Sequence, residues 1–134
     1  MIVLSNSNAQ VLSVGQSATF DSVLLHTGCG ECHRPNSGAV CLTQKNAIYE
    51  IGFNCNIGTT DPGNAQLALC IDSSPISETT VKTVTAAAGD LENVSASTFL
   101  QTCRCCNGIL TLTNTGTVEL TIDANPRVSV KRVA

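Results

Sequence analysis

Apolar and polar residues alternate along residues 48–57, and this two-residue period is the sequence feature that most constrains the fold. One apolar row results, formed by Tyr49, Ile51, Phe53, Cys55 and Ile57. Successive side chains of a β-strand point to opposite faces, so the row predicts a strand with one buried face. We expect this strand to lie in the centre of a sheet, with its apolar row in the core.

Short strand-like segments continue through the rest of the chain. The same period recurs at residues 66–72, 109–114 and 117–123, and less regular strand candidates lie at residues 9–14, 18–25, 40–42, 76–85, 91–101 and 127–133. Gly, Pro, Asn and Asp separate these segments at the points where the chain must reverse. No stretch of eleven residues shows helical spacing of apolar positions. The pattern predicts an all-β fold, an antiparallel jelly-roll sandwich of about 8–10 short strands.

The chain reads as one unit from end to end. Its 134 residues are within the usual size of a single domain. Turn signals occur at an even density, and we find neither an internal repeat nor a linker. Residues 1–134 are therefore expected to form a single jelly-roll domain.

Charge and composition argue against several classes of partner. The net charge is −3 and the seven Lys and Arg residues are dispersed, whereas nucleic-acid binding requires clustered positive charge. No apolar run approaches the roughly 20 residues of a membrane-spanning helix, so we expect no membrane insertion. Residues 1–4 are too short an apolar run, without a basic lead, for a signal peptide. We expect synthesis in the cytosol.

Five of the eight cysteines fall in two dense groups, with Cys29 and Cys32 in one and Cys103, Cys105 and Cys106 in the other. The first group has the C-x-x-C spacing that presents two thiolates to one tetrahedral ion. The remaining three cysteines stand singly in strand-like segments, where a cysteine usually packs as a small hydrophobe. Those three are Cys41, Cys55 and Cys70.

Three hypotheses account for the clustered cysteines. The two groups can complete a structural zinc site from Cys29, Cys32, Cys103 and Cys106, with Cys105 as a substitute ligand. Alternatively, disulfides join the two loops, or all five remain free thiols. We choose zinc, because assembly in a reducing cytosol comes before any exposure to oxidant.

Catalysis has little support in the sequence. Cys29 or Cys32 can be paired with His26 or His33 as a nucleophile and base, but no third orienting group is evident. Both histidines also lie before residue 34, which does not match the ligand set of a jelly-roll metalloenzyme. We predict that the protein is not an enzyme. A small thiol- or metal-dependent enzyme is the third functional hypothesis.

Segments spread over nearly the whole chain carry a resemblance to a known family. They are residues 15–21, 38–42, 47–53, 66–69, 112–116 and 127–132. In this pattern of strands and turns the chain resembles the TNF/C1q-like jelly-roll trimers, in particular the small bacteriophage and bacterial forms. Those forms are related to the C-terminal domains of spore-surface collagen-like glycoproteins.

The resemblance implies a non-enzymatic structural or binding module that forms a homotrimer. The expected roles are virion decoration, fibre head or receptor-binding protein of a bacteriophage, located on the virion surface. The implied partners are further copies of the chain, other virion or surface proteins, and a host surface receptor. The alternative is a disulfide-linked endospore appendage or spore-surface subunit. That family carries its bridging cysteines in an N-terminal connector, whereas residues 1–28 contain none.

Overall fold

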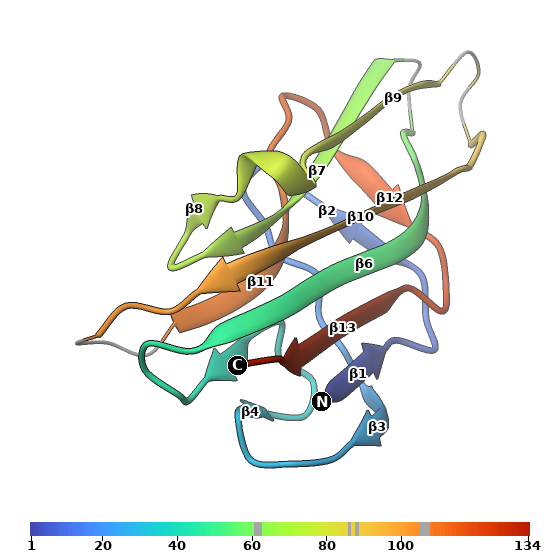
Figure 1. Ribbon diagram of the computed structural model, residues 1–134. Coiled ribbons are helices and arrows are strands. Elements are labelled where there is room, and N and C mark those ends of the chain that lie inside the picture. The colour runs from blue at the N-terminus through green and yellow to red at the C-terminus, as the bar shows by residue number, and fades with distance from the viewer. Residues whose placement is uncertain (61–62, 86, 88, 105–107) are drawn as a thin grey trace.

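Two antiparallel β-sheets pack face to face around a shared apolar core (Figure 1). This computed structural model describes residues 1–60, 63–85, 87, 89–104 and 108–134. Within that part of the chain there are thirteen strands and one 3-10 turn. The predicted all-β antiparallel sandwich is confirmed. The strands outnumber the expected 8–10 because several are only two or three residues long.

The first sheet has seven strands. Their bounds are β1 (Ile2–Ser5), β2 (Gln10–Leu12), β3 (Ser22–His26), β6 (Ile48–Gly58), β10 (Glu92–Gln101), β12 (Leu120–Ile122) and β13 (Arg127–Arg132). The order is β2-β12-β6-β13-β1-β3, with β10 along the other side of β6. Figure 1 shows the long β6 running between β10 and β13. The prediction that the strand at 48–57 is central is therefore confirmed.

The second sheet has six strands. Their bounds are β4 (Glu31–His33), β5 (Val40–Leu42), β7 (Gly63–Ile71), β8 (Ser74–Pro75), β9 (Val81–Thr85) and β11 (Gly108–Asn114). The order is β4-β5-β11-β7-β8, and β9 also pairs with β7. The tight connection from β7 to β8 places both Asp72 and Ser73 at positive φ, 49° and 69°. Positive φ at both central residues matches the twist of a two-residue hairpin.

The core lies between the two sheets and contains the apolar row of β6. Tyr49, Ile51 and Ile57 are fully buried, and Phe53 and Cys55 are each 4% exposed. Leucines of β7 and β11 contribute from the opposite sheet, namely Leu67, Leu69, Leu110 and Leu112. The expected burial of the row is confirmed. Packing of this apolar area is the main favourable term in the fold.

Several segments differ from the sequence expectation, among them the strand expected at 18–25, which is found at Ser22–His26, and the strand expected at 117–123, which is found at Leu120–Ile122. Residues 2–5 were not expected as a strand but form β1, and residues 31–33 form β4 within what was expected to be a loop. Such short segments have no room to show a two-residue period. The strand expected at 76–85 is instead divided by the 3-10 turn Ser77–Thr79. The hydroxyl of Thr79 accepts the backbone N–H of Leu69 at 3.0 Å and so fixes that turn against β7.

Both chain ends lie at one end of the sandwich, near β4 (Figure 1). The backbone N–H of Ile48 donates to the carbonyl oxygen of Ala134 at 3.1 Å, which places residue 134 beside the start of β6. In the described ranges, no helix has the length and apolar character needed to cross a membrane.

Candidate functional site

A row of small residues crosses the outer face of the seven-stranded sheet. Ser97 of β10 lies opposite Gly52 of β6, and Gly52 lies opposite Ser129 of β13. Ser129 in turn lies opposite Val3 of β1. We call Ser97, Gly52 and Ser129 the small-residue row. Because these side chains are small, the surface of the sheet is depressed across three neighbouring strands.

The small-residue row lines two shallow hollows. A hollow of about 420 Å³ extends toward Asn54 and Arg127, and one of about 260 Å³ extends toward Glu50 and Lys131. Gly52 is required by close approach, because a Cβ there would lie 3.1 Å from both the Ala96 carbonyl oxygen and the Ser97 Cβ. The face is therefore shallowly hollowed and open to solvent along these three strands.

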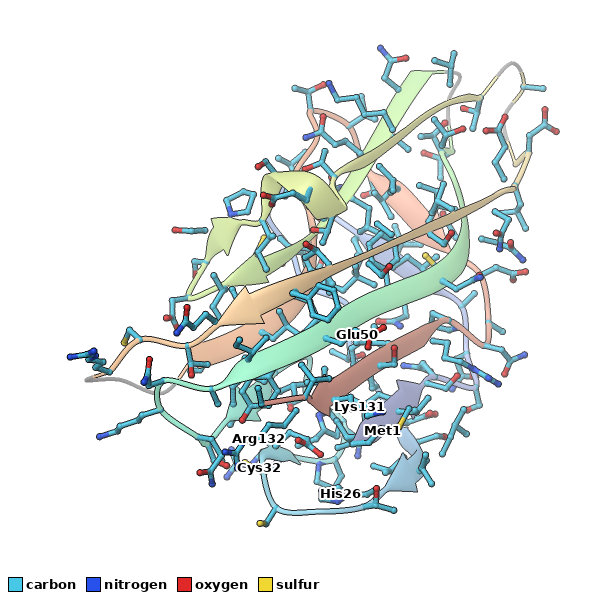
Figure 2. All side chains as sticks on the ribbon, in the orientation of Figure 1. Met1, His26, Cys32, Glu50, Lys131 and Arg132 are labelled. Carbon is cyan, nitrogen blue, oxygen red and sulfur yellow. The ribbon has the colours of Figure 1, made fainter. Side chains whose placement is uncertain are left out.

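Apolar and charged side chains flank the row at one end. Phe99 of β10 lies opposite Glu50 of β6 and is 66% exposed. Glu50 also lies opposite Lys131 of β13, and Figure 2 labels the two residues on these neighbouring strands. This face was not predicted from the sequence. The sequence pattern that belongs to this face is the Ser-x-Ser-x-Phe alternation of residues 95–99, but the other residues of the face come from strands that are distant in sequence.

The two cysteine groups lie against one connecting segment, residues 43–47. The backbone N–H of Thr43 donates to the carbonyl oxygen of Gly30 at 3.0 Å, beside Cys29. The backbone N–H of Asn46 donates to the carbonyl oxygen of Cys103 at 3.1 Å. Cys29 is exposed in the turn between β3 and β4, and Cys32 lies in β4 itself rather than in the expected loop. Cys29 and Cys103 therefore lie against the same connecting segment, at one end of the sandwich.

The oxidation states of the clustered cysteines differ. Cys29 and Cys32 are free thiols, whereas Cys103 is disulfide-bonded. Cys105 and Cys106 lie outside the described residues. Among the residues that are described, no three His, Cys, Asp or Glu side chains are grouped so as to hold a metal ion. Because zinc binds cysteine as thiolate, the four-cysteine site stays a prediction that requires reduced Cys103.

The three isolated cysteines occupy two kinds of environment. Cys55 and Cys70 are buried, as predicted for packing residues. Burial raises the pKa of the Cys55 thiol to about 12 and raises that of Cys70 as well. Cys41 is only half-buried and lies on the outer face of its sheet. Burial raises the pKa of Cys41, and hydrogen bonding and charge repulsion from Cys32 raise it further.

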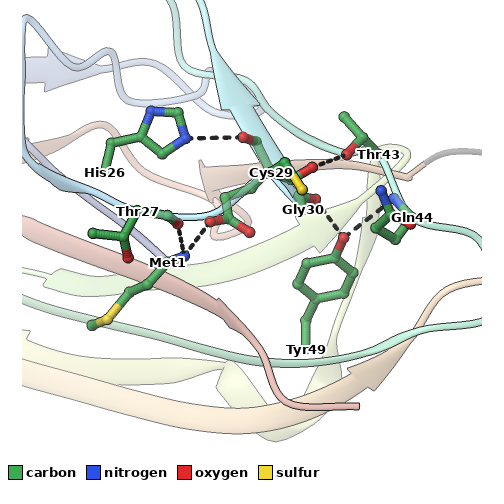
Figure 3. A network of polar contacts seen from close by, with 9 residues as sticks. Met1, His26, Thr27, Cys29, Gly30, Thr43, Gln44 and Tyr49 are labelled. Atoms are coloured by element: carbon green, nitrogen blue, oxygen red, sulfur yellow. Dashed lines mark hydrogen bonds and ion pairs between the residues drawn. The ribbon is translucent and has the colours of Figure 1, made fainter.

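Glu31 is a buried carboxylate at the start of β4. It is 3% exposed, and among the described residues its carboxylate oxygens accept no hydrogen bond. Its ion pair is with the terminal ammonium group of Met1, which also donates to the carbonyl oxygen of Thr27 (Figure 3). His26 Nε2 lies 3.2 Å from the backbone carbonyl oxygen of Glu31. The two contacts of the Met1 ammonium group join this residue, directly before β1, to β4 and to the loop that carries Cys29.

Tyr49 fixes the same loop from the core. Its hydroxyl donates to the carbonyl oxygen of Gly30 and accepts the backbone N–H of Gln44 at 3.3 Å (Figure 3). Burial raises the pKa of Tyr49, and the nearby negative charge of Glu31 contributes in the same direction. The hydroxyl of Thr43 donates to the carbonyl oxygen of Cys29 at 3.2 Å. These bonds end on backbone groups, which is typical of a structural network.

The histidines are likewise bound to backbone groups. His33 Nδ1 lies 3.0 Å from the carbonyl oxygen of Ala39, and Nε2 lies 3.2 Å from that of Phe20. The Phe20 and His33 rings also meet edge to face, with centroids 6.2 Å apart. Contacts of this kind hold an imidazole in place and do not direct it at a thiol.

The two sheets and their strand order define an antiparallel jelly-roll sandwich, a fold shared with solved structures of other proteins. The globular domain of zebrafish complement 1qA protein matches with a TM-score of 0.64 and 12% identity, over 99% of this chain and 96% of that chain. PRD1 vertex protein P5 matches with a TM-score of 0.55 and 14% identity, over 99% and 94%. The sequence matches no family profile and no curated protein. Likeness at these identities shows the fold alone.

Proposed function

We propose that the chain is a non-enzymatic structural or binding module that assembles as a homotrimer through the outer face of the seven-stranded sheet. The observation that carries this proposal is Phe99, an aromatic side chain 66% exposed beside the small-residue row. Burial of a large exposed aromatic side chain, together with the small-residue row beside it, against a second surface stabilises the complex. The C1q-like fold supports a threefold arrangement of the copies.

The charges on this face favour a second copy of the chain. Glu50 and Lys131 lie opposite each other and carry opposite signs, so the end of the face near Phe99 has no charge excess. Close approach of another copy therefore meets no net repulsion there. Rotation about a threefold axis turns the same face of each copy toward the axis and closes the assembly without free ends.

The edge strand β3 gives further support. Val23, Leu24 and Leu25 are between 43% and 53% exposed, so apolar side chains are open on both faces of this strand. Among the described strands β3 pairs only with β1. An exposed apolar edge strand promotes aggregation unless an assembly or a partner covers it.

The finer proposal is a position on a virion surface, as a decoration, fibre head or receptor-binding protein of a bacteriophage. PRD1 vertex protein P5 has the same fold over almost its whole length, which supports such a role. The partners would then be other virion proteins and a host surface receptor. Immunogold labelling of particles tests this position, and label confined to spore coats would overturn it.

Sedimentation equilibrium tests the trimer. The wild-type protein is expected to have three times the 13.9 kDa chain mass at micromolar concentration. Phe99→Asp introduces a charge into the proposed interface and should give monomers. Ile109→Asp is the matched control, because Ile109 is 46% exposed on the outer face of the other sheet and should leave the trimer intact. A monomeric wild type would contradict the proposal.

Structural zinc is a separate proposal on Cys29, Cys32, Cys103 and Cys106. Elemental analysis of protein purified under reducing conditions should find about one zinc per chain. Because each ligand must be a thiolate, chelation or acidification should release the metal and lower the melting temperature together. Reduced protein without bound metal would overturn the proposal.

A further inference from the structure

Two free thiols face each other on the outer face of the six-stranded sheet. β4 and β5 pair antiparallel with Cys32 directly opposite Cys41. Glu31, Val40 and Leu42 in the same two strands are buried, so the alternation places both cysteine side chains on the solvent side. The strand register thus brings together two cysteines that are separated by the connection between β4 and β5.

The separation of this pair suits a disulfide. Directly opposed residues of an antiparallel pair have Cα atoms about 4.5–5.5 Å apart, and disulfides span about 4.4–6.8 Å between Cα atoms. Neither strand has to change its register for the sulfurs to bond.

The other free thiols of the described residues are placed differently. Cys55 lies opposite Val94, and Cys70 lies opposite Thr111 and Pro75, so neither faces another cysteine. Both are also buried, whereas Cys32 is exposed to reagents. Cys29 is exposed but lies in a turn, outside the strand ladder. Cys32 and Cys41 are the directly opposed pair.

We propose that Cys32 and Cys41 are a cross-strand redox pair, which a small-molecule disulfide such as oxidised glutathione converts to a bond between β4 and β5. The Cys32 thiolate, the more exposed of the two, attacks one sulfur of the small disulfide and releases one thiol. The Cys41 thiolate then attacks the sulfur of Cys32, which forms the protein disulfide and releases the second thiol. The small disulfide gains two electrons, and the two cysteine protons end on the released thiols.

The bond would fix an otherwise weakly held strand. β4 is three residues long and, in the described part of the chain, pairs only with β5. The preceding loop and the first residue of β4 bind Tyr49 and Met1 through Gly30 and Glu31. Closing the loop at residues 33–40 constrains the unfolded chain and stabilises this end of the sandwich.

The redox pair and the zinc site compete for one atom. The sulfur of Cys32 is a ligand in the proposed four-cysteine site and cannot hold zinc while bonded to Cys41. The oxidation experiment is therefore done on metal-free protein with a chelator present. The redox proposal does not depend on the trimer.

Mass spectrometry of the full-length chain tests the pair. The protein is incubated with oxidised glutathione, its remaining thiols are alkylated, and it is cleaved after glutamate. The peptide 32–50 contains Cys32 and Cys41 and no other cysteine. It should be unalkylated and about 2 Da lighter than its reduced form, and it should accept two alkyl groups after reduction. The melting temperature of the oxidised protein should rise by about 5–10 °C.

Single substitutions separate this pair from its neighbours. Cys29→Ser should oxidise as the wild type does. In Cys41→Ser, Cys32 should retain a glutathione adduct and the melting temperature should not rise. If Cys41→Ser fails to fold, Cys32→Ser is used instead, and its melting temperature should likewise not rise on oxidation. A wild-type peptide that carries two alkyl groups or a lasting adduct would overturn the proposal. A disulfide between Cys32 and Cys29 would overturn it as well.

Discussion

At the scale of single residues, Tyr49 connects the core to the cysteine loop. It is fully buried, and its hydroxyl serves both the Gly30 carbonyl oxygen and the Gln44 backbone N–H. Tyr49→Phe keeps the ring but leaves the N–H of Gln44 without an acceptor. We expect a loss of about 1–2 kcal/mol in the free energy of unfolding.

The Tyr49→Phe effect should be local. Hydrogen exchange should become faster at the amides of Thr43 and Gln44, while the amides of β10 remain protected as in the wild type. Urea unfolding followed by circular dichroism gives the stability change. Unchanged exchange at the loop would show that its position does not depend on this hydroxyl.

Because of Cys55, the free energy of unfolding should fall as the pH rises into the alkaline range. Its thiol has an ordinary pKa of 9.0 and a folded-state pKa of about 12, because burial disfavours the thiolate. Above about pH 9 the unfolded chain therefore binds fewer protons than the native chain. The contribution of Cys55 is constant below pH 9 and falls by about 1.4 kcal/mol per pH unit up to about pH 12.

The variant Cys55→Ala isolates this effect. Its stability at pH 8 measures the packing cost of the substitution alone. Between pH 8 and pH 11 it should lose about 2–3 kcal/mol less than the wild type, since one titrating group has been removed. Cys70 and Tyr49 add losses of the same sign to both proteins. Equal losses in the two proteins would mean that Cys55 is not buried in solution.

At the scale of elements, β6 carries the stability of the seven-stranded sheet. It pairs with β10, β12 and β13, and its Phe53 is 4% exposed. Phe53→Ala should cost about 3–5 kcal/mol in urea unfolding, because it leaves a cavity in the core. Val84→Ala on β9 is the control, since Val84 is 69% exposed and should cost less than about 1 kcal/mol. Similar losses of unfolding free energy in Phe53→Ala and Val84→Ala would mean that β6 lies at an edge of the sheet.

The two-residue period predicted the elements that are buried on one face. β6, β7 and β11 were found from sequence because their inward positions are apolar and recur over seven residues or more. β1 and β4 were missed because strands of four and three residues are too short to show the two-residue alternation. The divided segment at 76–85 was missed because the Thr79 hydroxyl bonds to a strand distant in sequence, which no local pattern records.

The same limit applies to the candidate sites. The cysteine groups were visible in the sequence, and the location of Cys29 and Cys103 at one end of the sandwich follows from the contacts of residues 43–47. The pairing of Cys32 with Cys41 depends on the register of β4 and β5. The small-residue row depends on the registers of three strands from distant parts of the chain. Register between strands is set by the whole sandwich and could not be deduced from local spacing.

At the scale of the whole molecule, a trimer links stability to concentration. When three chains must associate to reach the native state, mass action raises the melting temperature as the chain concentration rises. For a chain of 134 residues we expect an increase of about 3 °C for each tenfold rise in concentration.

Differential scanning calorimetry over a hundredfold concentration range measures this dependence. Phe99→Asp should abolish it, because the charged side chain prevents burial of the face around Gly52, Ser97 and Ser129. Ile109→Asp should keep the wild-type dependence, since its charge lies on the opposite sheet. A wild-type melting temperature that is independent of concentration would contradict the trimer. The exposed Phe99 would then face a partner other than a second copy of the chain.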